Sequence, residues 1–109
     1  MQKLQVLWTE NAAYDLQLII GYIKLDSIET AKRIFYEIRK KCDNLSIFPE
    51  SQRIVPELQQ IGISKYREII YKRWRIIYKI EMDKVYILIV VDTSRNVEDI
   101  LFQRLLRDK

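Results

Sequence analysis

The chain of 109 residues contains no histidine, one cysteine, two glycines and two prolines. Without histidine, Ser-His-Asp and Cys-His catalysis and every imidazole general base are excluded. A single cysteine forms no internal disulfide, and it leaves a zinc site to be built mainly from carboxylates, which is a poor donor set. Two scattered glycines cannot form a glycine-rich phosphate-binding loop. We therefore expect no metal and no cofactor, and no residue pattern points to a catalytic group.

Long apolar runs are missing as well. No stretch approaches the roughly 18 residues of a membrane-spanning helix. The N-terminus MQKLQVLWTE is too polar for a signal peptide, so we expect a cytoplasmic protein with no membrane partner. The length of 109 residues and the hydrophobic content of 49% predict one domain over residues 1–109 with a substantial core.

What the sequence has in excess is positive charge in one place. The net charge is +4, and residues 1–50 contribute none of it, with seven cations against seven anions. The stretch YREIIYKRWRIIYKI, Tyr66–Ile80, reads as two strands joined by a turn; residues 65–79 carry six cations against Glu68 alone, a net of +5. Clustered cations predict an anionic partner, namely nucleic acid, an acidic protein segment or a membrane surface. The alternative is a solvated, solubilising edge.

Apolar spacing in the first half predicts a strand followed by a helical hairpin. Lys3–Trp8 forms the strand, and Thr9 caps the first helix. Gly21 inside that helix costs about 1 kcal/mol relative to Ala, so it marks a close approach of the second helix or is tolerated. Asp26 or Ser27 caps the second helix. Two helices of about 15 and 20 residues with so short a joint pack antiparallel. Their apolar stripes are Ala12, Leu16, Ile19, Ile20 and Ile23, then Ile28, Ala31, Ile34, Phe35, Ile38, Cys42 and Leu45.

The second half predicts a sheet and a last helix. A loop with one helical turn at Pro56 precedes the strands. The final strand is continuously apolar, as expected for burial on both faces, so a C-terminal helix or a bound partner must cover the face opposite the hairpin. Cys42, Trp74 and Tyr78 are expected in the core. The fold class is α+β in the order β-α-α-β-β-β-α, a helical hairpin packed on a small, mostly antiparallel sheet. The strands are Tyr66–Tyr71, Trp74–Glu81 and Lys84–Val91, and the last helix is Val97–Arg107, capped by Ser94 or Asn96.

The candidate site consists of cations. Arginine stays charged and binds phosphate or carboxylate in two places, but it moves no protons. We expect contacts with an anionic target from a set of five residues. For two of these, Arg67 and Arg75, a structural role is equally open: Arg75 can pair with Glu68 across the strands, and such an exposed pair is worth about 0–1 kcal/mol. The five residues are Arg67, Lys72, Arg73, Arg75 and Arg95.

Four segments together resemble toxins of the RelE/ParE superfamily, the small basic toxins of type II toxin–antitoxin modules. They are W-T-x-x-A-x-x-D-L at Trp8–Leu16, F-P-x-x-x-R-x-V-P-E-L at Phe48–Leu58, Y-R-E at Tyr66–Glu68 and R-I-I-Y at Arg75–Tyr78. The resemblance runs in order over nearly the whole chain. It implies the same fold and a cognate antitoxin as partner, which we expect to offer an acidic amphipathic segment to the cationic hairpin and the adjoining apolar strand. It also implies a toxin–antitoxin hetero-oligomer.

The superfamily contains two activities. RelE-like members cut messenger RNA in the ribosomal A site, and the resemblance implies that they use basic residues on the sheet plus a Tyr or His near the C-terminus. Here Arg67 and Arg75 match two basic positions, Ile69 occupies another, and Phe102 is the only aromatic residue after Thr93. Phenylalanine transfers no proton, so the ParE-like branch is favoured, whose members inhibit DNA gyrase, here expected together with its DNA. A RelE-like ribonuclease and a non-toxic antitoxin-binding or co-repressor module remain the alternatives.

Overall fold

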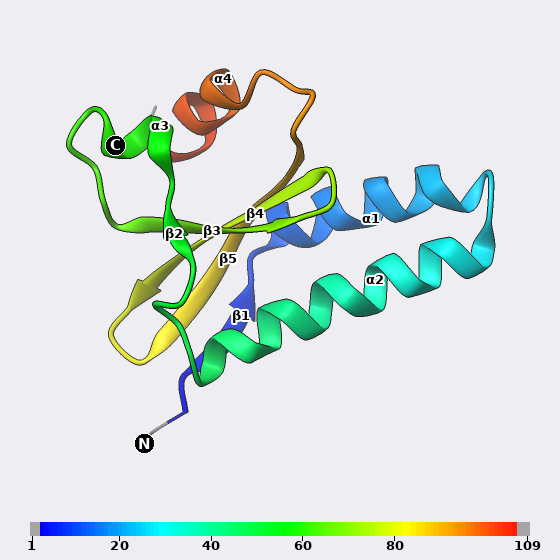
Figure 1. The fold of residues 1–109 in the computed structure, drawn as a ribbon, viewed down its shortest axis with the longest axis horizontal. Coiled ribbons are helices and arrows are strands. Elements are labelled where there is room, and N and C mark those ends of the chain that lie inside the picture. Colours follow the sequence, from blue (N-terminus) through cyan, green and yellow to red (C-terminus); the bar gives the residue numbers. More distant parts are fainter. Residues whose placement is uncertain (1–2, 107–109) are drawn as a thin grey trace.

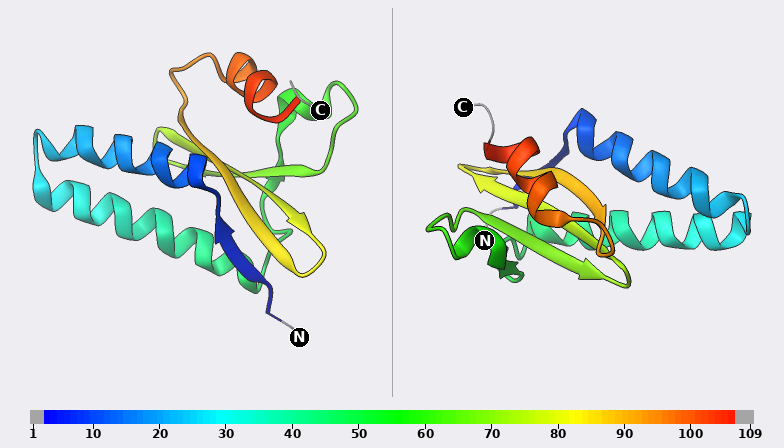
Figure 2. Two further views of the ribbon diagram at one scale, coloured as in Figure 1. Left: turned by 180° about the vertical axis from the view of Figure 1, so that it is seen from behind. Right: turned by 90° about the horizontal axis from the view of Figure 1, so that it is seen from above.

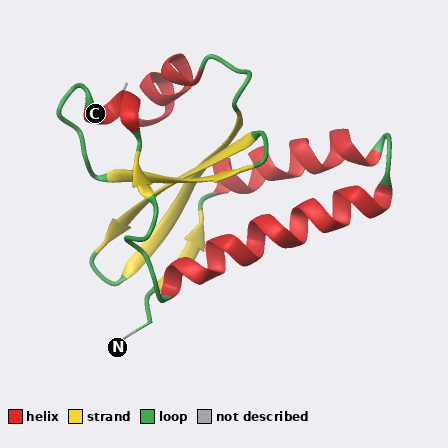
Figure 3. Ribbon diagram, viewed as in Figure 1, coloured by secondary structure: helices red, strands yellow, loops and turns green. Residues whose placement is uncertain are grey.

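The computed structural model describes residues 3–106 and has an α+β architecture, as predicted. Two long antiparallel helices lie on one face of a five-stranded sheet, and two short helices lie near the other face (Figures 1, 2 and 3). The elements are β1 (Gln5–Trp8), α1 (Glu10–Lys24), α2 (Ile28–Asp43), β2 (Arg53–Ile54), α3 (Pro56–Gln59), β3 (Tyr66–Tyr71), β4 (Trp74–Glu81), β5 (Lys84–Asp92) and α4 (Val97–Leu101).

Side-chain caps define where the long helices begin. Thr9 Oγ1 accepts a hydrogen bond from Ala12 N at 3.2 Å and donates one to Ile87 O at 2.9 Å, which ties the start of α1 to β5. Of the two candidate caps of α2, Ser27 is the one used, and its Oγ accepts from Thr30 N at 3.1 Å. The α1 helix has the expected 15 residues. The α2 helix has 16, because the chain tightens into a 3₁₀ turn at Asn44–Ser46.

The sheet order is β1-β5-β4-β3-β2, and the single parallel pair is β1 with β5. The sheet is therefore mostly antiparallel, as predicted. The prediction of a loop before β3 is wrong in one detail, because Arg53 and Ile54 form the short strand β2 and pair with Glu68 and Arg67. Two residues are too few to show the alternation by which a strand is recognised in a sequence. The helical turn after it, α3, begins at Pro56 as expected.

A β-bulge explains why the β5 sequence is continuously apolar. Ile77 of β4 pairs with Ile89, but Tyr78 pairs with Ile87, so Leu88 has no partner on β4. Because of this extra residue, odd-numbered side chains of β5 point to one face of the sheet before the bulge and to the other face after it. Val85 and Ile87 consequently pack with the long helices, whereas Ile89 and Val91 pack on the opposite face. The expected burial of this strand on both faces is confirmed.

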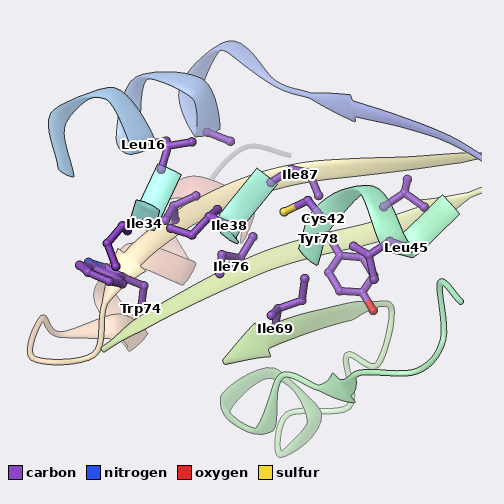
Figure 4. Close-up of a cluster of buried hydrophobic side chains, with 13 residues drawn as sticks. Leu16, Ile34, Ile38, Cys42, Leu45, Ile69, Trp74, Ile76, Tyr78 and Ile87 are labelled. Carbon is purple, nitrogen blue, oxygen red and sulfur yellow. The ribbon is translucent and has the colours of Figure 1, made fainter. Parts of the chain in front are cut away.

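The main core lies between the long helices and the sheet (Figure 4). Cys42, Trp74 and Tyr78 belong to it, as predicted, with exposed fractions of 0%, 7% and 0%. Two members of the predicted α2 stripe do not: Ile28 is 60% exposed and Phe35 is 41% exposed. Ile28 begins α2 at the far end of the helical hairpin, which extends beyond the sheet in Figure 1, so it has no strand to pack against. Phe35 follows the buried Ile34 and instead lines a groove between α1 and α2.

The opposite face of the sheet is covered by the C-terminal helix, one of the two candidates for this role. Val97 and Leu101 of α4 pack with Leu58 of α3 and with Ile77 and Ile89. The cap of α4 is Asn96 rather than Ser94, since Asn96 Oδ1 accepts from Asp99 N at 3.2 Å. Regular α-helix ends at Leu101 and continues as π-helix over Phe102–Leu106, so the predicted helix is present over the described residues but is only partly α-helical. Its last residue, Arg107, lies outside the described residues.

A polar network holds this C-terminal segment in place. Arg104 donates to Asp15 Oδ2 at 3.0 Å and to the carbonyl oxygen of Leu88 at 2.8 Å. Asp15 Oδ2 also accepts from Val90 N at 3.0 Å. Beyond Ile87 the outer edge of β5 has no pairing with β1. The two side chains satisfy backbone groups that this edge would otherwise leave unpaired.

Candidate functional site

Three of the five predicted cations gather where the β3–β4 turn meets the loop after β5. Lys72 and Arg73 form the turn, Arg95 lies in the loop, and all three are exposed. Arg73 Nε donates to Asp92 Oδ2 at 2.7 Å, and the carbonyl oxygen of Arg73 accepts from Thr93 N at 2.7 Å, which joins loop and turn. We call Lys72, Arg73 and Arg95 the basic tip. One carboxylate within it leaves the tip with a net positive charge.

The backbone and the rings beneath the tip hold it in a defined shape. Lys72 has φ = 52°, a left-handed conformation that ordinary side chains seldom adopt. Its Nζ lies 5.6 Å from the centre of the Tyr71 ring, which in turn stacks on Trp74 at 6.3 Å. A cation over an aromatic face is attracted to it. The turn therefore presents Lys72 in a restrained position at the end of the sheet.

A hollow of about 510 Å³ separates the basic tip from α1. Its apolar lining includes Ile19 and Ile23 of α1 and Trp74 of β4, and its charged lining consists of Arg73, Arg95, Asp26 and Asp92. An open hollow that combines apolar groups with the two arginines of the basic tip suits a partner that carries both apolar and acidic groups. The expected apolar surface next to the cations therefore exists, but it is not β5, because the chain's own helices cover both faces of that strand.

Arg67 is only partly exposed and is occupied by the loop before β2. Its Nη1 donates to Gln52 O at 2.6 Å and to Glu50 O at 3.4 Å. These carbonyl groups belong to the segment that leads into β2, so Arg67 fixes the outermost strand to β3. The side chain of Arg67 therefore stabilises the fold, and it lies away from the turn that carries the basic tip.

Arg75 lies inside an ion-pair network. Its Nε donates to Glu68 Oε1 at 2.6 Å, and its two terminal nitrogens donate to Glu57 Oε2 and Oε1 at 2.9 and 2.7 Å. Arg53 donates to the other oxygen of Glu68 at 2.7 Å. The side chain of Glu68 is 0% exposed and that of Arg75 is 9% exposed. The predicted Arg75–Glu68 pair exists, but it is buried rather than exposed, so the stability expected for an exposed pair does not apply.

The protonation behaviour of this network follows from its hydrogen bonds. The hydrogen bonds from Arg75 lower the pKa of Glu57 below its usual 4.5, and those from Glu57 and then Glu68 raise the pKa of Arg75. Both groups are therefore charged over the whole physiological range. Every carboxylate oxygen of Glu57 and Glu68 accepts from an arginine. The guanidinium of Arg75 is therefore occupied, and within this network it is Arg53, 55% exposed, that an anionic target could reach.

The groups that remain for proton transfer are also constrained. Tyr78 donates its hydroxyl to Pro49 O at 2.7 Å, and burial raises its pKa to about 12. Burial likewise raises the pKa of the Cys42 thiol to about 12, which keeps it protonated. Within residues 3–106 no group of three or more His, Cys, Asp or Glu side chains is placed to hold a metal ion. In the same part of the chain, no helix combines the length and apolar character needed to cross a bilayer.

One exposed feature escaped the sequence analysis, namely a second apolar stripe on α1. Tyr14, Leu18, Tyr22 and Leu25 are 59%, 56%, 76% and 80% exposed. We call these four residues the α1 ridge. The signal was present in the spacing of 4, 4 and 3 residues, which places them on one helical face outside the stripe that enters the core. A helix with apolar residues on more than one side indicates burial against something more than its own domain.

Three comparisons with known proteins bear on this site. The family model described as "ParE toxin of type II toxin-antitoxin system, parDE" matches residues 6–97. A solved structure described as "Chromosomal ParDE TA system from P. aeruginosa" has a TM-score of 0.67, covers 83% of this chain and 96% of that chain, and is 18% identical. That identity is low enough that the likeness shows the fold alone. A search of curated proteins finds no match.

The matched residues include both long helices, the whole sheet except Gln5 of β1, and the loop that carries Arg95. They cover the ion-pair network and the basic tip as well. Because the family model spans most of the chain, the chain belongs to the ParE toxin family of type II toxin–antitoxin systems.

Proposed function

We propose that this chain is the toxin of a type II toxin–antitoxin module, that it inhibits DNA gyrase in the cytoplasm, and that its cognate antitoxin neutralises it in a hetero-oligomeric complex. Family membership supports this proposal. The single observation that carries the target contact is the basic tip: three exposed cations with one carboxylate among them, beside an apolar hollow. Gyrase bound to DNA offers phosphates and acidic side chains, and both attract such a surface.

Of the five predicted contact residues, we retain Lys72, Arg73 and Arg95 as the centre of the target surface. Arg67 and Arg75 are proposed to act on the target only through the fold, because their donors are used by Gln52, Glu57 and Glu68. The proposal thus assigns target binding to Lys72, Arg73 and Arg95, and it assigns stabilisation of the fold to Arg67 and Arg75. The two residues that match basic positions of the RelE-like branch, Arg67 and Arg75, are thus bonded within the fold.

The test is a combined Lys72→Ala, Arg73→Ala, Arg95→Ala variant. A matched control removes three cations from the other end of the hairpins: Lys65→Ala, Lys79→Ala, Lys84→Ala. We expect the tip variant to lose cell killing and gyrase supercoiling inhibition by about tenfold or more, with melting temperature nearly unchanged, because exposed substitutions seldom move stability beyond about 0.5 kcal/mol. The control should behave like the parent. Equal activity of tip variant and parent would show that the basic tip is only a solvated edge.

The same cultures distinguish the other activities. Induction of the parent chain alone should cause double-strand breaks, the DNA-damage response and filamentous cells. Primer extension on total messenger RNA should show no codon-specific cuts, since general acid–base catalysis contributes about 10²–10⁴-fold and the segment after Thr93 contains no Tyr or His to supply it. Codon-specific cuts would restore the ribonuclease alternative. Normal growth on induction would favour the remaining alternative, a non-toxic antitoxin-binding or co-repressor module.

A further inference from the structure

The cations of the basic tip continue onto one side of α2. Arg33 and Lys41 share a face of that helix, because they are about two turns apart. This face is turned towards β3, since the Lys41 Nζ lies 5.3 Å from the centre of the Tyr71 ring. Lys72 of the basic tip lies 5.6 Å from the same ring, so one tyrosine joins the two sets of cations. We call the combined set the basic belt, which consists of Arg33, Lys40, Lys41, Lys72, Arg73 and Arg95.

The basic belt carries an excess of positive charge. Its six cations outnumber the three carboxylates beside them, which are Glu37 on α2, Asp92 at the tip and Asp26 across the hollow. Within residues 3–106 the belt lysines make no ion pair, whereas Lys79 and Lys84 at the other end of the sheet lie 3.5 and 3.2 Å from carboxylate oxygens. The belt lysines are therefore available to an anionic ligand.

Aromatic rings restrain these lysines. The Lys40 Nζ lies 5.9 Å from the centre of the Tyr36 ring, and Tyr71, which lies beside two further lysines, stacks on the buried Trp74. Attraction between an ammonium group and an aromatic face limits the motion of the long side chain, which lowers the entropy lost when a ligand pairs with it. Burial and then the carboxylate of Glu37 raise the pKa of the Tyr71 hydroxyl, so this group keeps its proton at pH 7 and can donate a hydrogen bond.

The chemistry of the belt on α2 fits phosphate better than an acidic protein surface. Contacts between proteins have an apolar centre, but here lysines lie over the rings of Tyr36 and Tyr71. The ammonium group of lysine is a point charge that pairs with phosphate without a fixed geometry. Interfaces with DNA are more polar and more positive than those between proteins, and lysine and tyrosine are among the residues that contact phosphate. A row of cations along a helix and around the end of a sheet matches the closely spaced phosphates of a duplex.

We propose that the basic belt binds the sugar–phosphate backbone of the duplex DNA held by gyrase, and that Lys40 and Lys41 are contact residues in addition to the basic tip. Contacts to phosphate do not depend on the base sequence. The inference rests on the proposed inhibition of gyrase, and it names DNA, rather than an acidic protein segment, as the anion at the belt. The apolar hollow on the other side of the tip is then left for gyrase itself.

The decisive variant is Lys40→Gln, Lys41→Gln, because both residues lie outside the basic tip. The probe is a fluorescent DNA duplex of about 20 base pairs, titrated with the chain in anisotropy at about 50–200 mM salt. If four of the six cations each meet a phosphate, a plot of log K against log salt concentration has a slope of about −3.6. Loss of two contacts should reduce the size of that slope by about 1.8 and weaken binding at about 100 mM salt by about tenfold or more.

A matched control removes the same charge from another side of the hairpin. Lys24 and Lys32 are exposed and line a hollow between α1 and α2. Lys24→Gln, Lys32→Gln should bind the duplex within about twofold of the parent, because these lysines lie outside the belt. Glutamine and lysine have similar helix propensities, so both variants should keep the melting temperature of the parent. Equal losses of affinity in the two variants would show that overall charge rather than the belt attracts DNA, and would overturn the inference.

Gyrase supercoiling assays on the same variants connect the contact with the target. The belt variant should lose inhibition by about tenfold, in step with its loss of duplex affinity, and the control should inhibit like the parent. A belt variant that binds the duplex poorly but inhibits gyrase like the parent would show that the belt does not contact the DNA held by gyrase, which overturns the inference. Tighter binding of an RNA duplex than of the DNA duplex by the parent would also overturn it.

Two further outcomes separate this inference from the proposed function. If the parent inhibits gyrase but binds no duplex even at about 50 mM salt, the inference fails and the proposed function stands. If the parent binds the duplex but does not inhibit gyrase, the proposed function fails, and the assignment to DNA held by gyrase fails with it. Unchanged duplex affinity of the belt variant, together with a loss of antitoxin affinity, would identify the antitoxin as the ligand of the belt and overturn the inference.

Discussion

Removal of Arg75 should destabilise the protein far more than removal of the neighbouring Arg73. Arg75 makes three hydrogen bonds to two carboxylates, and Glu68 is 0% exposed, so Arg75→Ala leaves a buried negative charge with only Arg53 beside it. Breaking a buried pair in this way costs about 3–5 kcal/mol. Arg73 is 64% exposed, and its single pair with Asp92 is screened by water, so Arg73→Ala should cost less than about 0.5 kcal/mol.

The measurement is urea unfolding at pH 7 and 25 °C, followed by far-ultraviolet circular dichroism. With a slope of about 1.5 kcal/mol per molar urea, a loss of 3 kcal/mol moves the midpoint of unfolding by about 2 M, and the Arg73 variant should move it by less than about 0.3 M. Arg75→Lys is a milder variant for which the folded state survives more readily. It keeps the charge but cannot form the same forked set of hydrogen bonds, so it should fall between the two.

The result that would refute this reasoning is an Arg75→Ala variant within about 1 kcal/mol of the parent. It would mean that water reaches Glu68 on removal of the guanidinium, or that Arg53 alone compensates for the charge. A double-mutant cycle with Glu57→Gln isolates the second carboxylate: the coupling free energy between Arg75 and Glu57 should be favourable. Additive effects would show that Glu57, whose side chain is 27% exposed, gains nothing from its two hydrogen bonds.

Three further predictions follow from protonation and charge. Because Arg75 holds the pKa of Glu57 below 4.5, the stability from this pair is complete above about pH 4.5 and is lost as pH falls through the folded-state value; Glu57→Gln should flatten that part of a plot of melting temperature against pH. Cys42 is 0% exposed with a pKa raised to about 12, so iodoacetamide at pH 8 should label it only at the rate of unfolding, and rapid labelling in native buffer would contradict its burial. Antitoxin affinity should fall as salt rises from 50 to 500 mM, since exposed charges are screened over about 8–10 Å at 0.1–0.15 M salt; unchanged affinity would show that pairs of opposite charge do not contribute to antitoxin binding.

The local pattern of the sequence determined the elements. Helical caps and apolar spacing predicted α1, α2, β3, β4 and β5 closely, because each depends on residues a few positions apart. The segment β2 and the π turn after Leu101 were missed for a related reason, since two paired residues and one widened turn leave no periodic signal. Ordered motifs also pointed to the family that the comparison confirms.

Only the tertiary structure determined which charged and apolar residues are exposed and available to a partner. Arg73 and Arg75 are two positions apart and look alike in the sequence, yet Arg75 lies within β4, where it meets Glu57 and Glu68, 18 and 7 residues away, whereas Arg73 lies in the turn before that strand. Both stripes of α1 consist of apolar residues, but only one faces the sheet; the α1 ridge lies on another face of the same helix and stays exposed. Burial depends on which distant segments arrive at a side chain, and local spacing does not contain that information.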